Sequence, residues 1–365
     1  MSNIVRFAQR ARAAHPAAAS GGIAPLLASF AHHRRQPGDA YWLKENGELL
    51  GVLSALNRRL PELALSVYQP FVEGAADMVA FHPQYARLIL NLITSLEDLG
   101  YPGGLGARLA DWMLDQGLVD AEVNDLQRAE LRFLMARHGR TVAFEGLDER
   151  LTRFMSRPET FAIPNPRAAY DLLHAVFYLA DYGRKPLKLQ PAVVESMLML
   201  GSLSHLEGNG DLLGEVCLAL HYAGEVLPPL WLRHLRAENT AFRISPGTCP
   251  DSSDCYHIFL VNQWLFGTIE DRAFGDAYSG GPMSIQLNRP AISPLREWSQ
   301  ALRAQGNRRS ADWSRMRSLC RDQVSENAFA RADLGAAESP MFDRFFARFA
   351  RASRPVPIWP EARPA

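Results

Sequence analysis

The sequence predicts an all-α protein built from about six helical hairpins. Five apolar runs of about three helical turns each end at a glycine, and these glycines recur about every 42 residues. Glycine takes the left-handed conformation in which many helices end, so each run is expected to be one helix. The runs are 85–100, 125–139, 171–183, 211–224 and 254–267, and a weaker sixth copy without the glycine is 46–61.

The segments between these runs have a different character. Residues 106–117 and 147–157 combine a polar face with an apolar face, and 191–203 also fits a helix. One period therefore contains two helices, which is the repeating unit of a helical-hairpin array. Strand signals are scarce, and the short pieces 242–246 and 283–290 are assigned to loops.

Two architectures fit a series of helical hairpins. An open solenoid exposes polar outer faces, whereas a closed ring surrounds one helix of each hairpin with neighbours. The count of about six, and the apolar character of the second helices all the way round, favour a closed or incomplete (α/α)6 toroid over residues 21–305. Residues 1–20 are expected to form a leader or a first helix, 306–354 helices packed on the toroid, and 355–365 a Pro-rich tail.

The composition argues against several classes of protein. Lys plus Arg and Asp plus Glu number 39 each, so no overall basic field attracts nucleic acid. Four cysteines are too few for a disulfide framework in 365 residues. No apolar run reaches the roughly 18 residues of a membrane span. We therefore expect a cytoplasmic protein that binds neither nucleic acid nor membrane.

Polar side chains recur at the starts of the three central runs. Residues three or four apart lie on one face of a helix, and the inner helices of a toroid run parallel. Pairs of polar residues at the helix starts should therefore meet at one end of the ring, beside the positive ends of the helix dipoles. These pairs are Asp171 with His174, Asp211 with Glu215, and Asp254 with His257.

The same residues allow two interpretations. Aspartate is common at the N-cap of a helix, which alone would explain Asp171, Asp211 and Asp254, and a buried histidine can be a hydrogen-bonded wall residue. In the functional interpretation, two histidines act as general acid/base groups or ligands, and the carboxylates tune their charge. The candidate catalytic residues are His174, His257, Glu215, Asp171 and Asp254.

Metal binding is an alternative role for these histidines and carboxylates. Two histidines and a carboxylate suit zinc or iron, and Cys249 and Cys255 could add thiolates. The dense spacing of a dedicated site, such as HExxH, is absent. No metal and no cofactor is therefore predicted.

The repeat pattern over residues 20–305 resembles that of α/α-toroid proteins, which include terpenoid cyclases, lanthipeptide cyclases and several (α/α)6 glycosidases. The resemblance is architectural and has no motif-level match. The segment "DSSD" at 251–254 lacks the third-position acid of the cyclase DxDD motif, and the zinc signatures of lanthipeptide cyclases are missing. The run "FYLADYG" at 177–183 also resembles a signature of uncharacterised bacterial toroid proteins.

These observations predict a soluble bacterial enzyme that acts on a small or medium organic substrate in a central cavity. Specialised metabolism is its expected setting, and a lyase, cyclase or hydrolase reaction is left open. The alternative is a non-catalytic helical-repeat protein that binds a peptide or protein partner on its concave face. The oligomeric state is not predicted.

Overall fold

The computed structural model describes residues 22–247, 254–288, 292–339 and 341–352. Its regular structure is almost entirely α-helical, which confirms the all-α class. The leader predicted at 1–20, the tail predicted at 355–365 and Cys249 lie outside the described residues. None of the described helices is long and apolar enough to cross a membrane.

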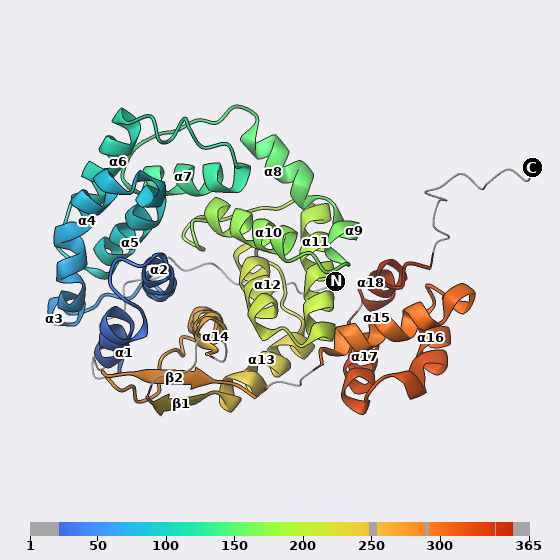
Figure 1. The fold of residues 1–365 in the computed structure, drawn as a ribbon. Coiled ribbons are helices and arrows are strands. Elements are labelled where there is room, and N and C mark those ends of the chain that lie inside the picture. The colour runs from blue at the N-terminus through green and yellow to red at the C-terminus, as the bar shows by residue number, and fades with distance from the viewer. Residues whose placement is uncertain (1–21, 248–253, 289–291, 340, 353–365) are drawn as a thin grey trace, which may run out of the picture.

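Six helices follow one another around a central space (Figure 1). Each contacts the next helix in the series, and the last contacts the first, so the series of contacts returns to its start. They are the apolar runs of the sequence, buried on nearly all sides because helices lie on both flanks and behind them. These inner helices are α2 (Ala40–Ala55), α5 (Ala86–Leu99), α7 (Asp125–Arg137), α10 (Pro166–Leu179), α12 (Gly210–Tyr222) and α14 (Tyr256–Ile269).

A second set of helices lies outside the first (Figure 1). Each connects or precedes inner helices in the chain, and most pack an apolar face inward and leave a polar face outside. The outer helices are α1 (Ile23–Ser29), α4 (Gln69–Phe81), α6 (Leu105–Asp115), α8 (Leu147–Met155), α11 (Pro191–Glu207) and α13 (Pro229–Ala241), with the short helices α3 (Glu62–Leu65) and α9 (Pro158–Phe161).

The inner helices run in the same direction. At one end, Ser54 in the last turn of α2 donates a hydrogen bond of 2.6 Å from its Oγ to Asp98 in the last turn of α5. Arg184, just beyond α10, donates to the same Oγ at 2.9 Å. At the other end, His257 in the first turn of α14 contacts Asp211 in the first turn of α12. The starts of the helices thus face one opening of the central space.

Gly100, Gly139 and Gly224 end their helices as predicted, and Gly183 also has positive φ but lies in a turn four residues beyond the end of α10. The prediction for the fifth, Gly267, is wrong, because α14 continues to Ile269. A Cβ at Gly267 would lie 2.7 Å from a methyl carbon of Leu56 and 2.9 Å from the Cβ of Ala273. This glycine therefore allows the end of α14 to pack closely against the end of α2, where a larger residue would not fit.

The two segments assigned to loops in the sequence form a small sheet. Strand β1 (Arg243–Pro246) pairs antiparallel with β2 (Met283–Gln286), with Ile244 opposite Ile285. The side chain of Ile285 is buried, so the pair covers apolar surface beside α14. Strands of four residues are too short to give a period-2 signal in the sequence.

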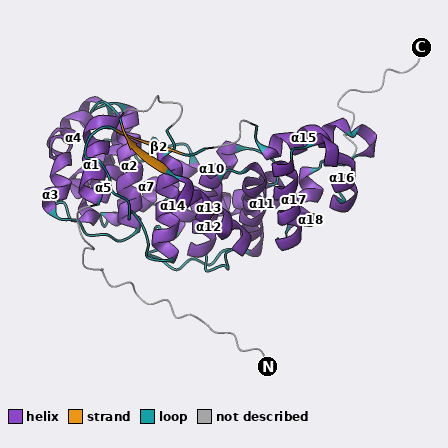
Figure 2. Ribbon diagram, turned by 90° about the horizontal axis from the view of Figure 1, so that it is seen from below, coloured by secondary structure: helices purple, strands orange, loops and turns teal. Residues whose placement is uncertain are grey.

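The last helices lie to one side of the inner and outer helices (Figures 1 and 2). They contact α11 and α13 on the outer side, and Trp298 is fully buried among them. The first of these helices falls within the range predicted for the toroid, but it packs with the later ones. They are α15 (Pro294–Ala304), α16 (Trp313–Cys320), α17 (Glu326–Glu338) and α18 (Phe342–Phe349).

A buried ion-pair cluster joins the first inner helix to the last. Arg34 ends a short π-helical turn, Phe30–Arg34. Its Nε contacts Glu45 of α2 at 2.7 Å, and its Nη1 contacts Asp254, just before α14, at 2.9 Å. The guanidinium lies between the rings of Phe30 and Tyr256, 4.8 and 4.6 Å from their centroids. Burial lowers the pKa of Arg34, but Asp254 and Glu45 outweigh burial and raise it.

Candidate functional site

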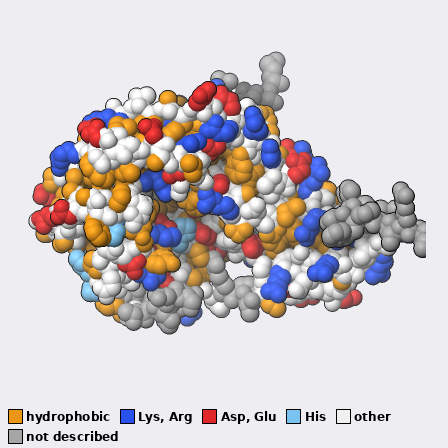
Figure 3. All heavy atoms as spheres, turned by 45° about the horizontal axis from the view of Figure 1, so that its top comes forward, with side chains coloured by type: hydrophobic (Ala, Val, Ile, Leu, Met, Phe, Trp, Pro, Cys, Tyr) orange, Lys and Arg blue, Asp and Glu red, His pale blue; other side chains and the backbone are white. Residues whose placement is uncertain are grey.

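The inner helices enclose a cavity of about 770 Å³. All six contribute side chains to its lining, from the first turns of the helices to the last. Figure 3 shows acidic and basic side chains together around the hollow between the inner helices. A concave site with a largely apolar lining and a few convergent polar groups is the usual form of a small-molecule site.

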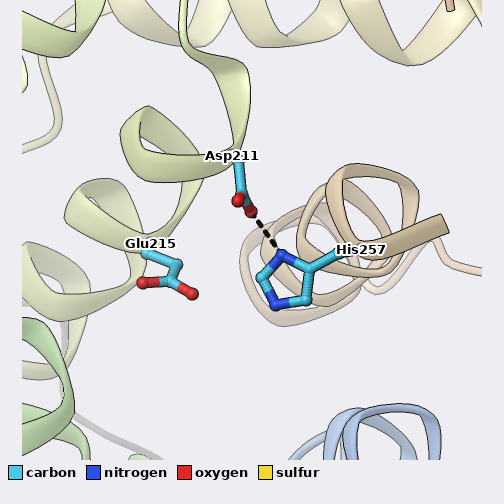
Figure 4. A group of neighbouring side chains, drawn as sticks. All are labelled: Asp211, Glu215 and His257. Atoms are coloured by element: carbon cyan, nitrogen blue, oxygen red, sulfur yellow. Dashed lines mark hydrogen bonds and ion pairs between the residues drawn. The ribbon is translucent and has the colours of Figure 1, made fainter. Parts of the chain in front are cut away.

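Three of these polar groups lie within reach of one another (Figure 4). Asp211 and Glu215 are one turn apart on α12, and His257 comes from the first turn of α14. His257 Nδ1 and Asp211 Oδ1 are 2.8 Å apart, and each of the three side chains has a ligand-type atom within 4.8 Å of the others. The carboxylate of Glu215 points into the space beside the imidazole.

The second ring nitrogen of His257 also faces a carboxylate. Its Nε2 lies 3.6 Å from Glu48 of α2, and Glu48 in turn accepts a hydrogen bond of 2.6 Å from Lys44. Burial lowers the pKa of His257, but the hydrogen bond to Asp211 and the charges of Asp211, Glu48 and Glu215 together raise it to about 10. The imidazole is therefore a cation at neutral pH, with both N–H groups directed at carboxylates.

Glu215 has no such partner. Its side chain lines the cavity although the residue is only 8% exposed, and within the described chain it makes no hydrogen bond or ion pair. Burial and the neighbouring charge of Asp211 raise the pKa of Glu215 to about 8, and His257 opposes this. Glu215 is thus a carboxyl group that holds a proton near neutral pH and can give it up.

Asp211, Glu215 and His257 could also hold a divalent cation. One imidazole with two carboxylates suits manganese, iron or zinc. A metal ligand must, however, present a free nitrogen lone pair. Both nitrogens of His257 lie beside carboxylates that favour its protonated form. The donor set therefore fits proton transfer better than metal binding.

A second polar network lines the same cavity from α5, α7 and α10. Arg87 forms an ion pair with the buried carboxylate of Glu130, and Tyr178 is hydrogen-bonded to that carboxylate. The Tyr178 hydroxyl also lies 3.2 Å from His174 Nδ1. Because the phenol donates to Glu130, His174 Nδ1 carries the proton that is shared with Tyr178. Burial lowers the pKa of His174 to about 3, so this histidine is neutral.

Aromatic rings form a continuous part of the cavity lining. Phe177 lies 5.0 Å from Trp264, and Tyr182 lies 5.7 Å from Trp264, measured between ring centroids. Tyr182 follows α10 in a turn in which Asp181, Tyr182 and Gly183 all have positive φ. Such a run is costly for residues other than glycine, and here it turns the ring of Tyr182 back into the cavity.

Comparison with known proteins identifies a family for the chain. A family model described as "Domain of unknown function (DUF6902)" matches residues 1–352. The chain belongs to the DUF6902 family. No curated protein matches it. No solved structure matches it either.

The DUF6902 cavity contains part of the predicted catalytic set. His174, Glu215 and His257 line it, together with Asp211. Asp171 and Asp254 do not. The side chain of Asp171 pairs with the exposed Arg167 at 2.9 Å, and Asp254 pairs with Arg34 in the ion-pair cluster.

The interpretation of the aspartates as N-caps is wrong for α10 and α12. Asn165 caps α10 and Asn209 caps α12, each accepting a hydrogen bond from a backbone N–H three residues on. Helix α10 begins at Pro166, a residue favoured in the first helical turn, so Asp171 lies in its second turn. Asp254 does accept a hydrogen bond from the Tyr256 N–H at 2.8 Å, ahead of α14.

The sequence analysis did not identify six charged residues that line the cavity of the DUF6902 chain, namely Lys44, Glu48, Arg87, Asp98, Glu130 and Arg184. Glu48, Arg87 and Glu130 lie near the starts of the other three apolar runs, where the same rule would have found them. Glu48 belongs to the weak sixth copy, which lacks the closing glycine. Polar residues near the starts of all six inner helices thus line the cavity.

Glycine at position 51 is expected to keep the DUF6902 cavity open at a cost in stability. Gly51 lines the cavity from α2, and a Cβ placed there meets nothing within 4 Å. Alanine is more favourable than glycine inside a helix by about 0.8–1.0 kcal/mol. Gly51→Ala should therefore raise the free energy of unfolding, measured with urea, by up to about 1 kcal/mol.

Gly201→Ala is the matched control. A Cβ at Gly201 of α11 would lie 2.2 Å from the ring of Trp231, so this variant should lose about 1–3 kcal/mol through overpacking. If Gly51→Ala were destabilised to a similar extent, the space beside Gly51 would not be open.

Proposed function

We propose that this chain is an enzyme that transfers protons to or from a small or medium organic molecule bound inside an (α/α)6 toroid. The contacts that run from α2 round to α14 and back to α2 support the closed toroid over the open solenoid. The observation that carries the function is the buried, unpartnered carboxyl of Glu215 in a cavity beside the Asp211–His257 pair.

The roles assigned to these groups differ from those expected from the sequence. Glu215 is the group whose pKa lies closest to neutrality, so it is the proton donor or acceptor. His257 is a cation that Asp211 orients, and it stabilises negative charge that develops on the substrate. The neutral His174 and Tyr178 hold the adjoining part of the lining, on α10, in position.

The alternative of a peptide-binding concave face predicts an open ring or a centre filled by Phe and Leu side chains. The cavity of about 770 Å³, with charged groups of both signs in its lining, favours a small molecule instead. A proton-transfer centre is compatible with the lyase, cyclase and hydrolase reactions that the sequence left open.

The test begins with compounds that raise the melting temperature of the purified protein, which are then assayed for turnover. Glu215→Gln keeps the shape of the side chain but cannot exchange a proton in this range. It should lower kcat by at least about 100-fold, the usual contribution of a general acid or base. Asp171→Asn is the matched control outside the cavity and should retain turnover. Wild-type kcat in Glu215→Gln would reject the proposal.

A further inference from the structure

The charged groups in the cavity lining are matched in pairs, with one exception. The lining contains five carboxylates and four basic groups, apart from the neutral His174. Each basic group contacts a carboxylate of the lining: Lys44 with Glu48, Arg87 with Glu130, Arg184 with Asp98, and His257 with Asp211. The carboxylate left over is Glu215, which is more than nine-tenths buried and directed into the cavity.

The rings of the lining are the second, independent feature. Phe177, Tyr182 and Trp264 contact one another in a continuous cluster that lines the same cavity as Glu215. Within the described residues, no guanidinium or ammonium group lies over these three rings. Aromatic faces attract cations, most strongly where water is excluded, and rings together with a carboxylate form the usual site for a quaternary or protonated amine.

We propose that the cavity binds an organic cation, whose ammonium group lies between the Glu215 carboxylate and the aromatic cluster of Phe177, Tyr182 and Trp264. The proposal rests on the proposed function, because it names the class of molecule that the same cavity takes. An uncharged molecule of equal shape leaves Glu215 protonated and forms no ion pair with it, and an anion further disfavours its carboxylate form. The cavity thus discriminates by charge.

Binding of the cation is linked to a proton. Without a ligand, Glu215 is protonated, and a neighbouring ammonium group stabilises its carboxylate form. Binding near neutral pH therefore releases a proton to the buffer and places Glu215 in the form that acts as a base. The other charged and titratable groups that face Glu215 are Asp211 on its own helix, His257 on α14, Glu48 and Lys44 on α2, and Tyr170 and Tyr182 from α10 and its following turn.

The test compares two probes of equal shape, choline and 3,3-dimethylbutan-1-ol, in which a carbon replaces the quaternary nitrogen. Calorimetry with the full chain should show choline binding at least about tenfold more tightly, equivalent to about 1.4 kcal/mol. The heat of choline binding should depend on the ionisation enthalpy of the buffer, because a proton is released. Glu215→Gln should weaken the preference for choline and remove the dependence on buffer, whereas Asp171→Asn should keep both.

Three outcomes would overturn the inference: equal binding of the two probes, an unchanged preference in Glu215→Gln, or tight binding of one Zn²⁺ per chain at Asp211, Glu215 and His257 without binding of choline. The cation preference and the proposed function can fail independently of each other. If Glu215→Gln abolishes the turnover of an uncharged compound and neither probe is preferred, proton transfer stands and the cation preference is rejected.

Discussion

Arg34→Met is expected to lower the free energy of unfolding by about 3–5 kcal/mol, because removing one partner of a buried ion pair leaves a buried charge without compensation. The side chains of Arg34, Glu45 and Asp254 are 7%, 2% and 10% exposed. Glu45 keeps a contact with Arg35 in the variant, but Asp254 loses its only ion-pair partner within the described chain. Equilibrium unfolding in urea, followed by circular dichroism, measures the change.

Arg167→Met is the matched control for this prediction. Arg167 also contacts a predicted catalytic aspartate, Asp171, but its side chain is 63% exposed. A solvent-exposed pair contributes at most about 1 kcal/mol, so this variant should be close to wild type. Equal effects of the two substitutions would show that the cluster around Arg34 does not hold the first and last inner helices together.

Glu215→Gln is expected to change how stability depends on pH. Burial and Asp211 raise the pKa of Glu215 to about 8 in the folded chain, whereas the pKa of a glutamate in an unfolded chain is about 4.3. Between these values the folded chain binds a proton that the unfolded chain does not, so stability falls as the pH rises. Wild type should therefore lose stability relative to Glu215→Gln by on the order of a few kcal/mol between roughly pH 5 and pH 8.5, since one pKa unit corresponds to about 1.4 kcal/mol.

Paired urea unfolding curves of the two proteins across this pH range provide the measurement. The raised pKa of His257 also makes stability fall with rising pH, but this contribution is present in both proteins and is reduced in the comparison. Curves that stay parallel across the range would show that folding does not perturb the titration of Glu215.

The helical elements were predicted well because their signals are local. Residues 125–139 correspond to α7 and 211–224 to α12 within two residues at each end. An apolar run of three turns and a following glycine are set by neighbours in the chain. Gly267 departs from this rule because its role is a contact with Leu56, which lies more than 200 residues earlier in the chain.

The electrostatic roles in the site could not be predicted from the sequence. His174 and His257 occupy matching places in their runs, yet the pKa of one falls to about 3 and that of the other rises to about 10. The difference depends on which groups lie beside each ring. His257 has Asp211 and Glu48 as neighbours, whereas His174 is stacked on Tyr170 with ring centroids 3.8 Å apart.

The sequence by itself determined where the helices lie, their pairing into hairpins and the recurrence of polar residues near the starts of the inner ones. Only the tertiary structure decided which of those residues share the cavity. Asp171 and Asp211 look equivalent in the chain, but one pairs with exposed Arg167 and the other with His257. The rotation of each helix about its own axis makes this difference, and that rotation is set by packing against neighbours distant in the sequence.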